Sequence, residues 1–308
     1  MSFPSNPLQW SIGLVGYGEV GRILAEDLRA RGVDNVLAYD TKLGTAQDAP
    51  LRAHAAQYGV PLMADHAALA RAAELVISAV TADQTLAVAV SSAPTLKPGT
   101  WFLDFNSASP KAKIEAAAII DAAGGRYVEG AVMTSIPPHR IRVPLLLGGP
   151  GAAELAPLLK ELGFVARVAS EKLGVASATK MCRSVMIKGL EAIVIESFTA
   201  ARAYGVEDAV VASLYETFPG IDWEEQGAYF FQRVIEHGRR RAEEMREVAQ
   251  TVREAGLAPC SAAGSAERDA AMAALADEGV FGARGSTDFA RSADWRIEAD
   301  RILARGRQ

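Results

Sequence analysis

Cysteine is scarce in this sequence, and an excess of positive charge is absent. Its 308 residues include two cysteines, too few for a disulfide framework, so the composition favours a reducing, cytoplasmic setting. Lysine and arginine number 32 against 37 aspartates and glutamates, and the formal charge of −5 is not the basic footprint of a nucleic-acid-binding protein. We therefore expect neither a disulfide-stabilised domain nor a nucleic-acid partner.

Long apolar runs are also missing. No stretch of about eighteen uncharged apolar residues occurs, and residues 1–10 contain no basic segment that leads into an apolar one. These absences predict a protein with no membrane span and no secretory signal. Half of the residues are nevertheless hydrophobic, which is enough to bury two cores in a chain of this length.

The character of the sequence changes part-way along the chain. As far as residue 150, short β-rich runs alternate with Ala-rich helical stretches, the order of strand, helix and parallel strand. From Gly174 onward the patterns are helical. We predict two domains, an α/β domain at residues 1–170 and an all-α domain at residues 171–308. The expected strands are residues 11–16, 35–39, 75–80, 101–105, 126–132 and 144–147, and the expected helices between them are residues 19–31, 50–58, 66–72, 84–92 and 110–123.

A glycine-rich turn follows the first expected strand. Gly16, Gly18 and Gly21 form the pattern G-x-G-x-x-G between an apolar strand and a helical segment, which is the context of the dinucleotide fingerprint. The first glycine permits the tight turn, the second leaves room for the pyrophosphate, and the third lets helix and strand pack closely. Amides at the helix start then face the phosphates. The motif predicts a Rossmann-type doubly wound sheet whose cofactor contacts are Gly16, Tyr17, Gly18, Glu19, Val20 and Gly21.

An acidic residue extends the expected cofactor site. Asp40 ends the next strand, at the distance where such folds place a carboxylate that binds the ribose diol and repels a 2′-phosphate. We therefore predict NAD as cofactor, with NADP possible because Lys42 and Arg52 follow closely. The alternative is a non-binding α/β sheet in which Asp40 is a solvated strand end. Further cofactor candidates stand where later strands end: Val80, Thr81 and Asn106, with Ser107 equally suited to capping a helix.

The long apolar segment at residues 174–205 carries a polar stripe. At 100° per residue, Lys180, Arg183, Ser184, Lys188 and Glu191 fall within about 140° on one side of a helix. Oxidation of an alcohol by hydride transfer needs a group that takes the hydroxyl proton, and a partly desolvated Lys180 beside Arg183 suits that role. From the residues alone, Lys180 and Lys188 are equally suited to reach solvent or to pair with Glu191.

Three segments together resemble the β-hydroxyacid dehydrogenase family, relatives of 3-hydroxyisobutyrate and 6-phosphogluconate dehydrogenases: GLVGYGEVG, DFNSASP and GVASATKM. Their order and spacing hold across most of the chain. The resemblance implies an NAD(P)-dependent dehydrogenase that interconverts a small β-hydroxy acid and its oxo form, with Lys180 as the general acid/base. It also implies that the helical domain serves substrate binding and dimerisation, so we expect a homodimer.

Two departures from the family pattern concern the expected substrate site. The family's K-x-x-N-N becomes Lys180 followed by Arg183 and Ser184. Its substrate loop, D-A-P-V-S-G-G, reads E-G-A-V-M-T-S at residues 129–135, so Met133 replaces a serine while Thr134 and Ser135 offer hydroxyls. These features resemble a less characterised subgroup with its own carboxy-terminal domain.

Two other functions stay open. An apolar pocket around Met133 favours an imine or ketone reductase of the same fold. A non-catalytic dinucleotide-binding regulator would keep the glycine turn and Asp40 but would not need Lys180.

A charged helix near residues 224–255 adds two substrate candidates. His237, Arg240, Arg241 and Glu244 share one face beside an apolar stripe. Since arginine binds a carboxylate in a bidentate fork, His237 and Arg241 are suited to hold an acid substrate. The alternative is helix packing with an Arg240–Glu244 pair. His237 has too few Cys, Asp or His neighbours for a metal site, so we expect no metal.

Overall fold

The protein folds into two compact units. The structure, a computed structural model, describes residues 4–287, 289, 290 and 292–305. The units comprise residues 1–181 and 182–308, so the division falls within one long helix, α8 (Val175–Tyr204). The expected boundary lies earlier, after residue 170. The difference arises because the first turns of α8 pack with the sheet of the first unit.

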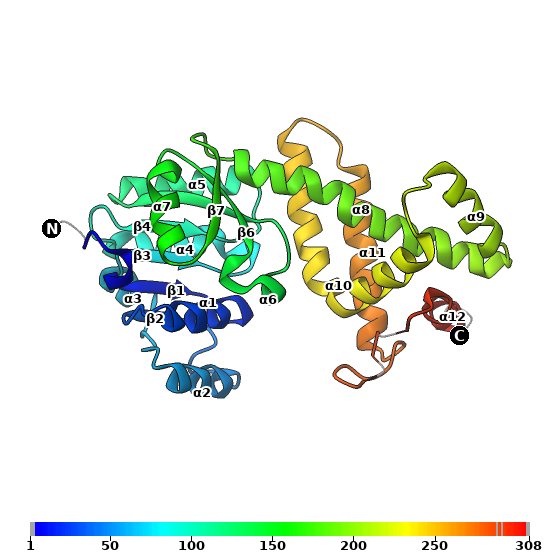
Figure 1. Ribbon diagram of the computed structural model, residues 1–308, viewed down its shortest axis with the longest axis horizontal. Helices are drawn as coiled ribbons and strands as arrows, with labels where there is room; N and C mark the ends of the chain where they lie inside the picture. Colours follow the sequence, from blue (N-terminus) through cyan, green and yellow to red (C-terminus); the bar gives the residue numbers. More distant parts are fainter. Residues whose placement is uncertain (1–3, 288, 291, 306–308) are drawn as a thin grey trace. The chain divides into compact units, whose positions relative to one another are not determined.

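A seven-stranded sheet forms the first unit, with strand order β2-β1-β3-β4-β5-β6-β7 (Figure 1). β1 to β5 pair in parallel, and the chain order reverses at β1, which has β2 on one side and β3 on the other. This switch point is where doubly wound sheets bind ligands. The strands are β1 (Ile12–Val15), β2 (Val36–Tyr39), β3 (Leu75–Ser78), β4 (Trp101–Asp104), β5 (Arg126–Val132), β6 (Pro144–Gly148) and β7 (Val165–Ser170).

The last two strands differ from the sequence prediction. β6 runs antiparallel to β5, because the connection at residues 133–143 is too short for a parallel crossover. β7 lies at the edge of the sheet and is not among the expected strands. Its residues are mostly exposed, so it lacks the apolar run that marks the buried strands. In position, β1 to β6 match the six predicted strands, so only β7 is additional.

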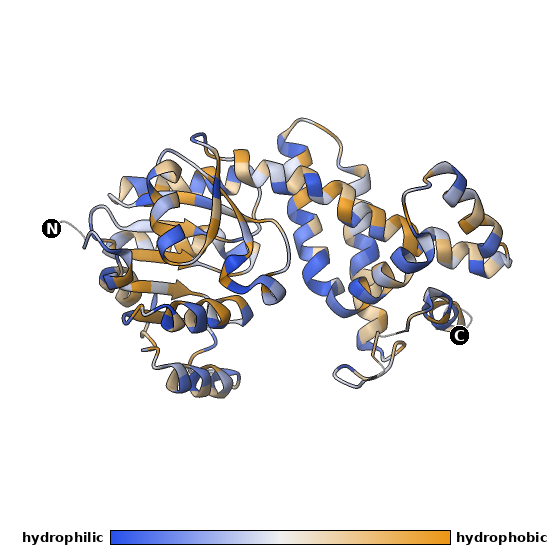
Figure 2. Ribbon diagram, in the orientation of Figure 1, coloured by the Kyte–Doolittle hydropathy of each residue, from blue (hydrophilic) through white to orange (hydrophobic). Residues whose placement is uncertain are grey.

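Helices cover both faces of this sheet, which confirms the doubly wound Rossmann-type fold. Successive residues of β3 join different cores: Leu75 and Ile77 belong to one cluster, and Val76 to the other. Figure 2 accordingly shows the strands as predominantly hydrophobic. The helices are α1 (Glu19–Ala30), α2 (Asp48–Tyr58), α3 (His66–Ala72), α4 (Thr85–Ser92), α5 (Pro110–Ala122), α6 (Ile136–His139) and α7 (Ala152–Glu161), with short 3-10 turns at residues 7–9, 82–84, 93–95 and 140–142.

The described part of the second unit contains helices joined by loops and no strand. Its aromatic core gathers Phe198, Phe231 and Trp295, which come from three helices. α10 and α11 pack closely at Gly238, where a Cβ atom would lie 2.7 Å from the carbonyl oxygen of Asp269. None of the described helices is long and apolar enough to cross a membrane. Beyond α8 the helices are α9 (Glu207–Thr217), α10 (Trp223–Glu254), α11 (Cys260–Asp277) and α12 (Trp295–Arg305).

Candidate active site

The glycine-rich turn between β1 and α1 has the shape that a dinucleotide requires. Gly16 adopts a φ of +91°, and its Cβ would lie 2.4 Å from the carbonyl oxygen of Ala79. A Cβ at Gly21 would lie 2.1 Å from the carbonyl oxygen of Gly16. At Gly18, by contrast, a Cβ would meet nothing within 4 Å. Crowding therefore explains why Gly16 and Gly21 are glycines. The open space beside Gly18, at the start of α1, fits the pyrophosphate.

Asp40 and Tyr17 form part of this turn rather than only lining it. The buried Asp40 carboxylate accepts hydrogen bonds from the backbone N–H of Tyr17, at 2.8 Å, and of Lys42, at 2.9 Å. Because a carboxylate offers about four acceptor positions, it still has capacity for a ribose diol. The Tyr17 side chain is fully buried, whereas Glu19 is exposed and Val20 half-buried in the first turn of α1.

The carboxyl ends of β3 and β4 are joined by Asn106. Its side-chain oxygen accepts from the backbone N–H of Val80 at 2.7 Å, and its Nδ2 donates to the Ser78 hydroxyl at 3.0 Å. The buried amide thus bridges the two strand ends. Thr81 is exposed and donates its hydroxyl to Asp83 at 2.5 Å. Val80, Thr81 and Asn106 therefore lie at the expected edge of the sheet.

A buried ion pair, which the sequence did not reveal, supports the same loop. Lys113 on α5 is 1% exposed, and its Nζ lies 2.8 Å from Oδ1 of Asp104 at the end of β4. The Asp104 carboxylate also accepts from the Tyr127 hydroxyl at 2.6 Å and from the backbone N–H of Asn106 at 2.8 Å. Burial and the nearby Asp104 charge raise the pKa of Tyr127 well above its ordinary value. These contacts hold the start of the loop that carries Ser107.

Lys180 reaches that loop from α8. Its Nζ lies 2.5 Å from the hydroxyl oxygen of Ser107, and both side chains are half-buried. The structure therefore brings the predicted proton-transfer residue to the carboxyl edge of the sheet. Two neighbouring residues have different contacts at this edge: Asn106 bridges the ends of β3 and β4, and Ser107 contacts Lys180.

Glu129 fixes the beginning of α8. This fully buried residue on β5 accepts hydrogen bonds from the backbone N–H of Ala176, at 3.0 Å, and from the Ser177 hydroxyl, at 2.7 Å. A carboxylate at a helix N-terminus also interacts favourably with the helix dipole. Gly148 makes room for it, because a Cβ there would lie 2.2 Å from Glu129. Lys180 therefore stands on a helix whose first turn is tied to the sheet.

Removing the Ser177 hydroxyl tests this tie. We expect Ser177→Ala to lower the free energy of unfolding by about 1.5–3 kcal/mol, because a buried carboxylate loses one hydrogen bond. Thr179→Ala is the matched control, since the exposed Thr179 hydroxyl bonds only to the carbonyl of Val175 in its own helix. Urea unfolding followed by circular dichroism compares the two, and equal losses would contradict the role of Glu129.

The expected substrate loop follows β5. Met133 packs against a small apolar cluster of Ala131, Leu146 and Ala176, the last of which belongs to the first turn of α8. Thr134 is exposed, and Ser135 is the half-buried residue before α6. The loop therefore offers one apolar and two hydroxyl side chains.

Ion pairs join helices within the second unit. Lys188 pairs with Glu244, and Glu191 pairs with Arg241, so α8 and α10 contact each other through the polar stripe of α8. Arg241 is 2% exposed, and burial lowers its pKa. Arg240 pairs with Glu244 at 3.4 Å, as the packing alternative predicts. The remaining substrate candidates are placed as follows: Arg183 is exposed, Ser184 is buried, and His237 is half-buried.

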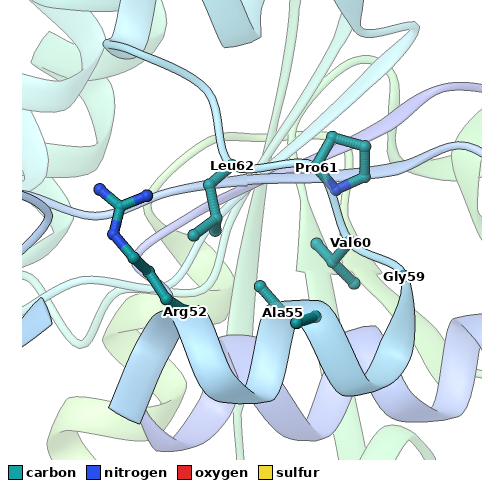
Figure 3. A pocket seen from close by; sticks show the side chains of 7 residues that line it. Arg52, Ala55, Gly59, Val60, Pro61 and Leu62 are labelled. Atoms are coloured by element: carbon teal, nitrogen blue, oxygen red, sulfur yellow. The ribbon is translucent and has the colours of Figure 1, made fainter. Parts of the chain in front are cut away.

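One open pocket lies apart from these residues. It measures about 560 Å³ and lies between α2 and the segment that pairs with β2 at Ala38 (Figure 3). Arg52 is its one charged lining residue, and the Nε of Arg52 lies 2.8 Å from Asp48. Among the described residues, no group of three or more His, Cys, Asp or Glu is arranged to hold a metal ion. The lining residues are Arg52, Ala55, Ala56, Gly59, Val60, Pro61 and Leu62.

Comparison with known proteins identifies the family. The model described as the NAD binding domain of 6-phosphogluconate dehydrogenase matches residues 11–163, and a domain of unknown function, DUF1932, matches residues 201–272. A conserved hypothetical protein from Sinorhizobium meliloti 1021 is 39% identical, with 94% of this chain and 96% of that chain covered and a TM-score of 0.74. The chain belongs to the 6-phosphogluconate dehydrogenase-like family. Within this family it is a member with a DUF1932 domain, and its first unit is an NAD(P)-binding domain.

Other members and neighbours extend this assignment. The conserved protein MTH1747, described as structurally similar to 3-hydroxyacid dehydrogenases, is 28% identical, covers 86% of this chain and 98% of its own, and has a TM-score of 0.67. Two more distant structures show the fold alone. A 3-hydroxyisobutyrate dehydrogenase from Mycobacterium tuberculosis, with L-serine, is 16% identical over 95% and 99% of the two chains, with a TM-score of 0.72. A reductive aminase from Aspergillus terreus, with NADPH, is 18% identical over 92% and 97%, with a TM-score of 0.54.

Proposed function

We propose that this protein is an NAD(P)-dependent dehydrogenase that interconverts a small β-hydroxy acid and its oxo form. The observation that carries the proposal is the contact between Lys180 and Ser107 at the carboxyl edge of the sheet, the edge where the glycine turn accepts a dinucleotide. A dinucleotide regulator would not need a lysine there. The family and its neighbours are mainly dehydrogenases and reductases, which agrees with this chemistry.

The proposed mechanism assigns the proton to Lys180. Bound cofactor supplies the hydride acceptor, or the hydride donor in the reverse direction. The neutral amine of Lys180 takes the substrate's hydroxyl proton as the alcohol is oxidised, and the ammonium returns it to the carbonyl oxygen during reduction. Ser107 accepts a hydrogen bond from Nζ and thereby orients it toward the reacting oxygen. Glu129 keeps the helix that carries the lysine in place.

The substrate contacts in this proposal come from two segments. Thr134 and Ser135 offer hydroxyls beside the apolar Met133, and Arg183 and Ser184 follow Lys180 by one turn of α8. Arg183, which is exposed, is our first choice for the substrate carboxylate. His237 is a second choice. We assign Arg241 to packing of α8 against α10, because it is buried and paired with Glu191.

Turnover assays on the purified protein test this function. A panel of β-hydroxy acids is incubated with NAD or NADP, and formation of the reduced cofactor is followed by absorbance. Oxidation of at least one β-hydroxy acid is expected. Reduction of imines or ketones without any acid turnover would favour the reductase alternative, which the apolar surroundings of Met133 support. Cofactor binding with no turnover would favour a regulator.

We propose NAD as the preferred cofactor. In this proposal the Asp40 carboxylate binds the ribose diol and repels a 2′-phosphate, and the nearby Arg52, which could attract that phosphate, is paired with Asp48. Asp40→Asn removes the negative charge but keeps one acceptor oxygen for the turn. We expect this change to raise the dissociation constant of NAD about tenfold and that of NADP much less.

Calorimetric titration of both cofactors measures this change of preference. Asp34→Asn is the control, because Asp34 precedes β2 with a fully exposed side chain. Equal effects of Asp40→Asn on the two dissociation constants would contradict the ribose contact.

A homodimer and a cytoplasmic setting complete the proposal. The described part of α8 in the second unit exposes large apolar side chains, with Met186 at 72% and Ile193 at 62%, which suits contact with a second copy. Both cysteines, Cys182 and Cys260, are free, as expected in a reducing compartment.

A further inference from the structure

A row of polar contacts leads from the glycine turn to the loop that follows β5. The Tyr17 hydroxyl lies 2.8 Å from Nδ1 of His54 on α2. Nε2 of His54 lies 2.9 Å from Oε1 of Glu26 on α1, and Oε2 of Glu26 accepts from the Arg140 guanidinium at 2.7 Å. Four side chains from separate elements therefore form one connected row within the first unit.

The row has a consistent direction of hydrogen bonding. Burial raises the pKa of Tyr17 to about 12, so its hydroxyl keeps its proton and donates to Nδ1 of His54. The histidine then carries its own proton on Nε2 and donates to Glu26. Burial alone would raise the pKa of Glu26, but hydrogen bonds from His54 and Arg140 outweigh it and hold that pKa below its ordinary value. A single tautomer of His54 thus satisfies every link.

Arg140 is held more firmly than an ordinary loop residue. Its Nε donates to Asp27 at 2.8 Å, and the backbone N–H of Ile141 donates to the other oxygen of the same carboxylate at 2.9 Å. Arg140 also has a φ of +54°, a conformation that residues with a Cβ rarely adopt. The contacts to Glu26 and Asp27 compensate for this unfavourable backbone. Together with the buried side chains of Ile136 and Ile141, they hold this part of the loop against α1.

The same loop contains the proposed substrate side chains. Residues 133–143 connect β5 to β6 and carry Met133, Thr134 and Ser135. β5 and β6 hold the two ends of the loop, and Arg140 attaches its middle to α1. At the other end of the row, the backbone N–H of Tyr17 donates to Asp40 in the cofactor turn. The row therefore connects Asp40, the residue expected to bind the ribose, to the expected substrate loop.

We propose that Arg140 is a positioning residue that couples the two sites: through Glu26, His54 and Tyr17 it links the position of the substrate loop to occupancy of the dinucleotide turn. This inference rests on the proposed function, because it assumes that the turn binds a dinucleotide. Coupling of this kind is reciprocal, so a bound dinucleotide steadies the loop and a steady loop favours the dinucleotide.

Hydrogen exchange of the loop amides measures the coupling directly. The full-length protein is compared with and without saturating NAD, or NADP if that binds more tightly. In the unaltered protein we expect the dinucleotide to slow exchange at residues 133–143 about tenfold. Tyr17→Phe, which removes one hydroxyl, and Arg140→Ala, which removes the guanidinium, should each abolish most of that slowing while the dinucleotide still binds.

Matched variants separate the coupling from general stability. Arg142→Ala is the control, because Arg142 is exposed on the same turn, and it should retain the tenfold slowing. Arg140→Gly relieves the positive φ without restoring the ion pairs. It should therefore melt at a higher temperature than Arg140→Ala yet show the same loss of coupling. The double variant Tyr17→Phe/Arg140→Ala should bind the dinucleotide no more weakly than the weaker-binding of the two single variants, because both changes interrupt the same row of contacts.

The outcomes distinguish this inference from the proposed function. If the dinucleotide binds to Tyr17→Phe and Arg140→Ala and slows hydrogen exchange of their loop amides as much as in the unaltered protein, the coupling is refuted while the dehydrogenase proposal stands. Additive losses of affinity in the double variant would refute it as well. If the unaltered protein binds neither NAD nor NADP, both proposals fail.

Discussion

Replacing Lys180 by methionine should lower the turnover of a β-hydroxy acid by about 10²- to 10⁴-fold, the usual contribution of a general acid/base. Methionine has a similar length but carries no exchangeable proton, so the helix and its packing are retained. Because Lys180 contacts Ser107 after β4, and the glycine turn follows β1, we expect the dissociation constant of the cofactor to change little. Steady-state kinetics and calorimetric titration of the cofactor measure the two quantities separately.

The nearby Lys172 provides the control for this variant. It is exposed and precedes α8, so Lys172→Met should leave turnover unchanged. Undiminished turnover in Lys180→Met would remove the lysine from the mechanism. A large loss of cofactor affinity in that variant would instead indicate that the lysine acts in binding.

Replacing Lys113 by methionine should lower the free energy of unfolding by about 3–5 kcal/mol, because it leaves the buried Asp104 carboxylate without its cation. Lys113 and Asp104 are almost fully buried, and their charged atoms lie 2.8 Å apart. Urea unfolding measures the loss, and hydrogen exchange of the β4 amides assigns it to the first unit.

Two further variants test the cause of that loss. Lys111→Met on the same helix should change stability by less than about 0.5 kcal/mol, because Lys111 is exposed. The double variant Lys113→Met/Asp104→Asn should be more stable than Lys113→Met alone, since it no longer buries an uncompensated charge. A double variant that is less stable than Lys113→Met would contradict this explanation.

The burial found in the structure differs most from the exposure that the sequence pattern predicts at charged residues. Lys113 lies in a helical segment whose charges resemble a solvated face, yet it is enclosed between α5 and the sheet. Arg241 and Glu191 belong to different helices, and their pairing required both helices to be packed. Burial of a charge depends on the partner that reaches it, and that partner stands far away in the sequence.

The glycine turn shows the opposite case. Gly16, Gly18 and Gly21 are close in sequence, and their roles follow from local sterics, so the motif could be interpreted before any fold was known. Asp40 was found by its spacing from that turn. Its hydrogen bond to Tyr17, however, depends on how β2 lies beside β1.

The sequence by itself determined the doubly wound domain, the helical segments that follow it and the glycine-rich turn, whereas Lys180 became the candidate for proton transfer only through the resemblance to a known family. These features depend on local backbone geometry, on the periodicity of apolar residues and on motifs of a few neighbouring positions. Only the tertiary structure decided that Ser107 meets Lys180, that Glu129 holds α8, and that Arg140 connects to Tyr17 through Glu26 and His54. Each of these contacts joins residues from distant parts of the chain, and such contacts exist only once the elements have packed.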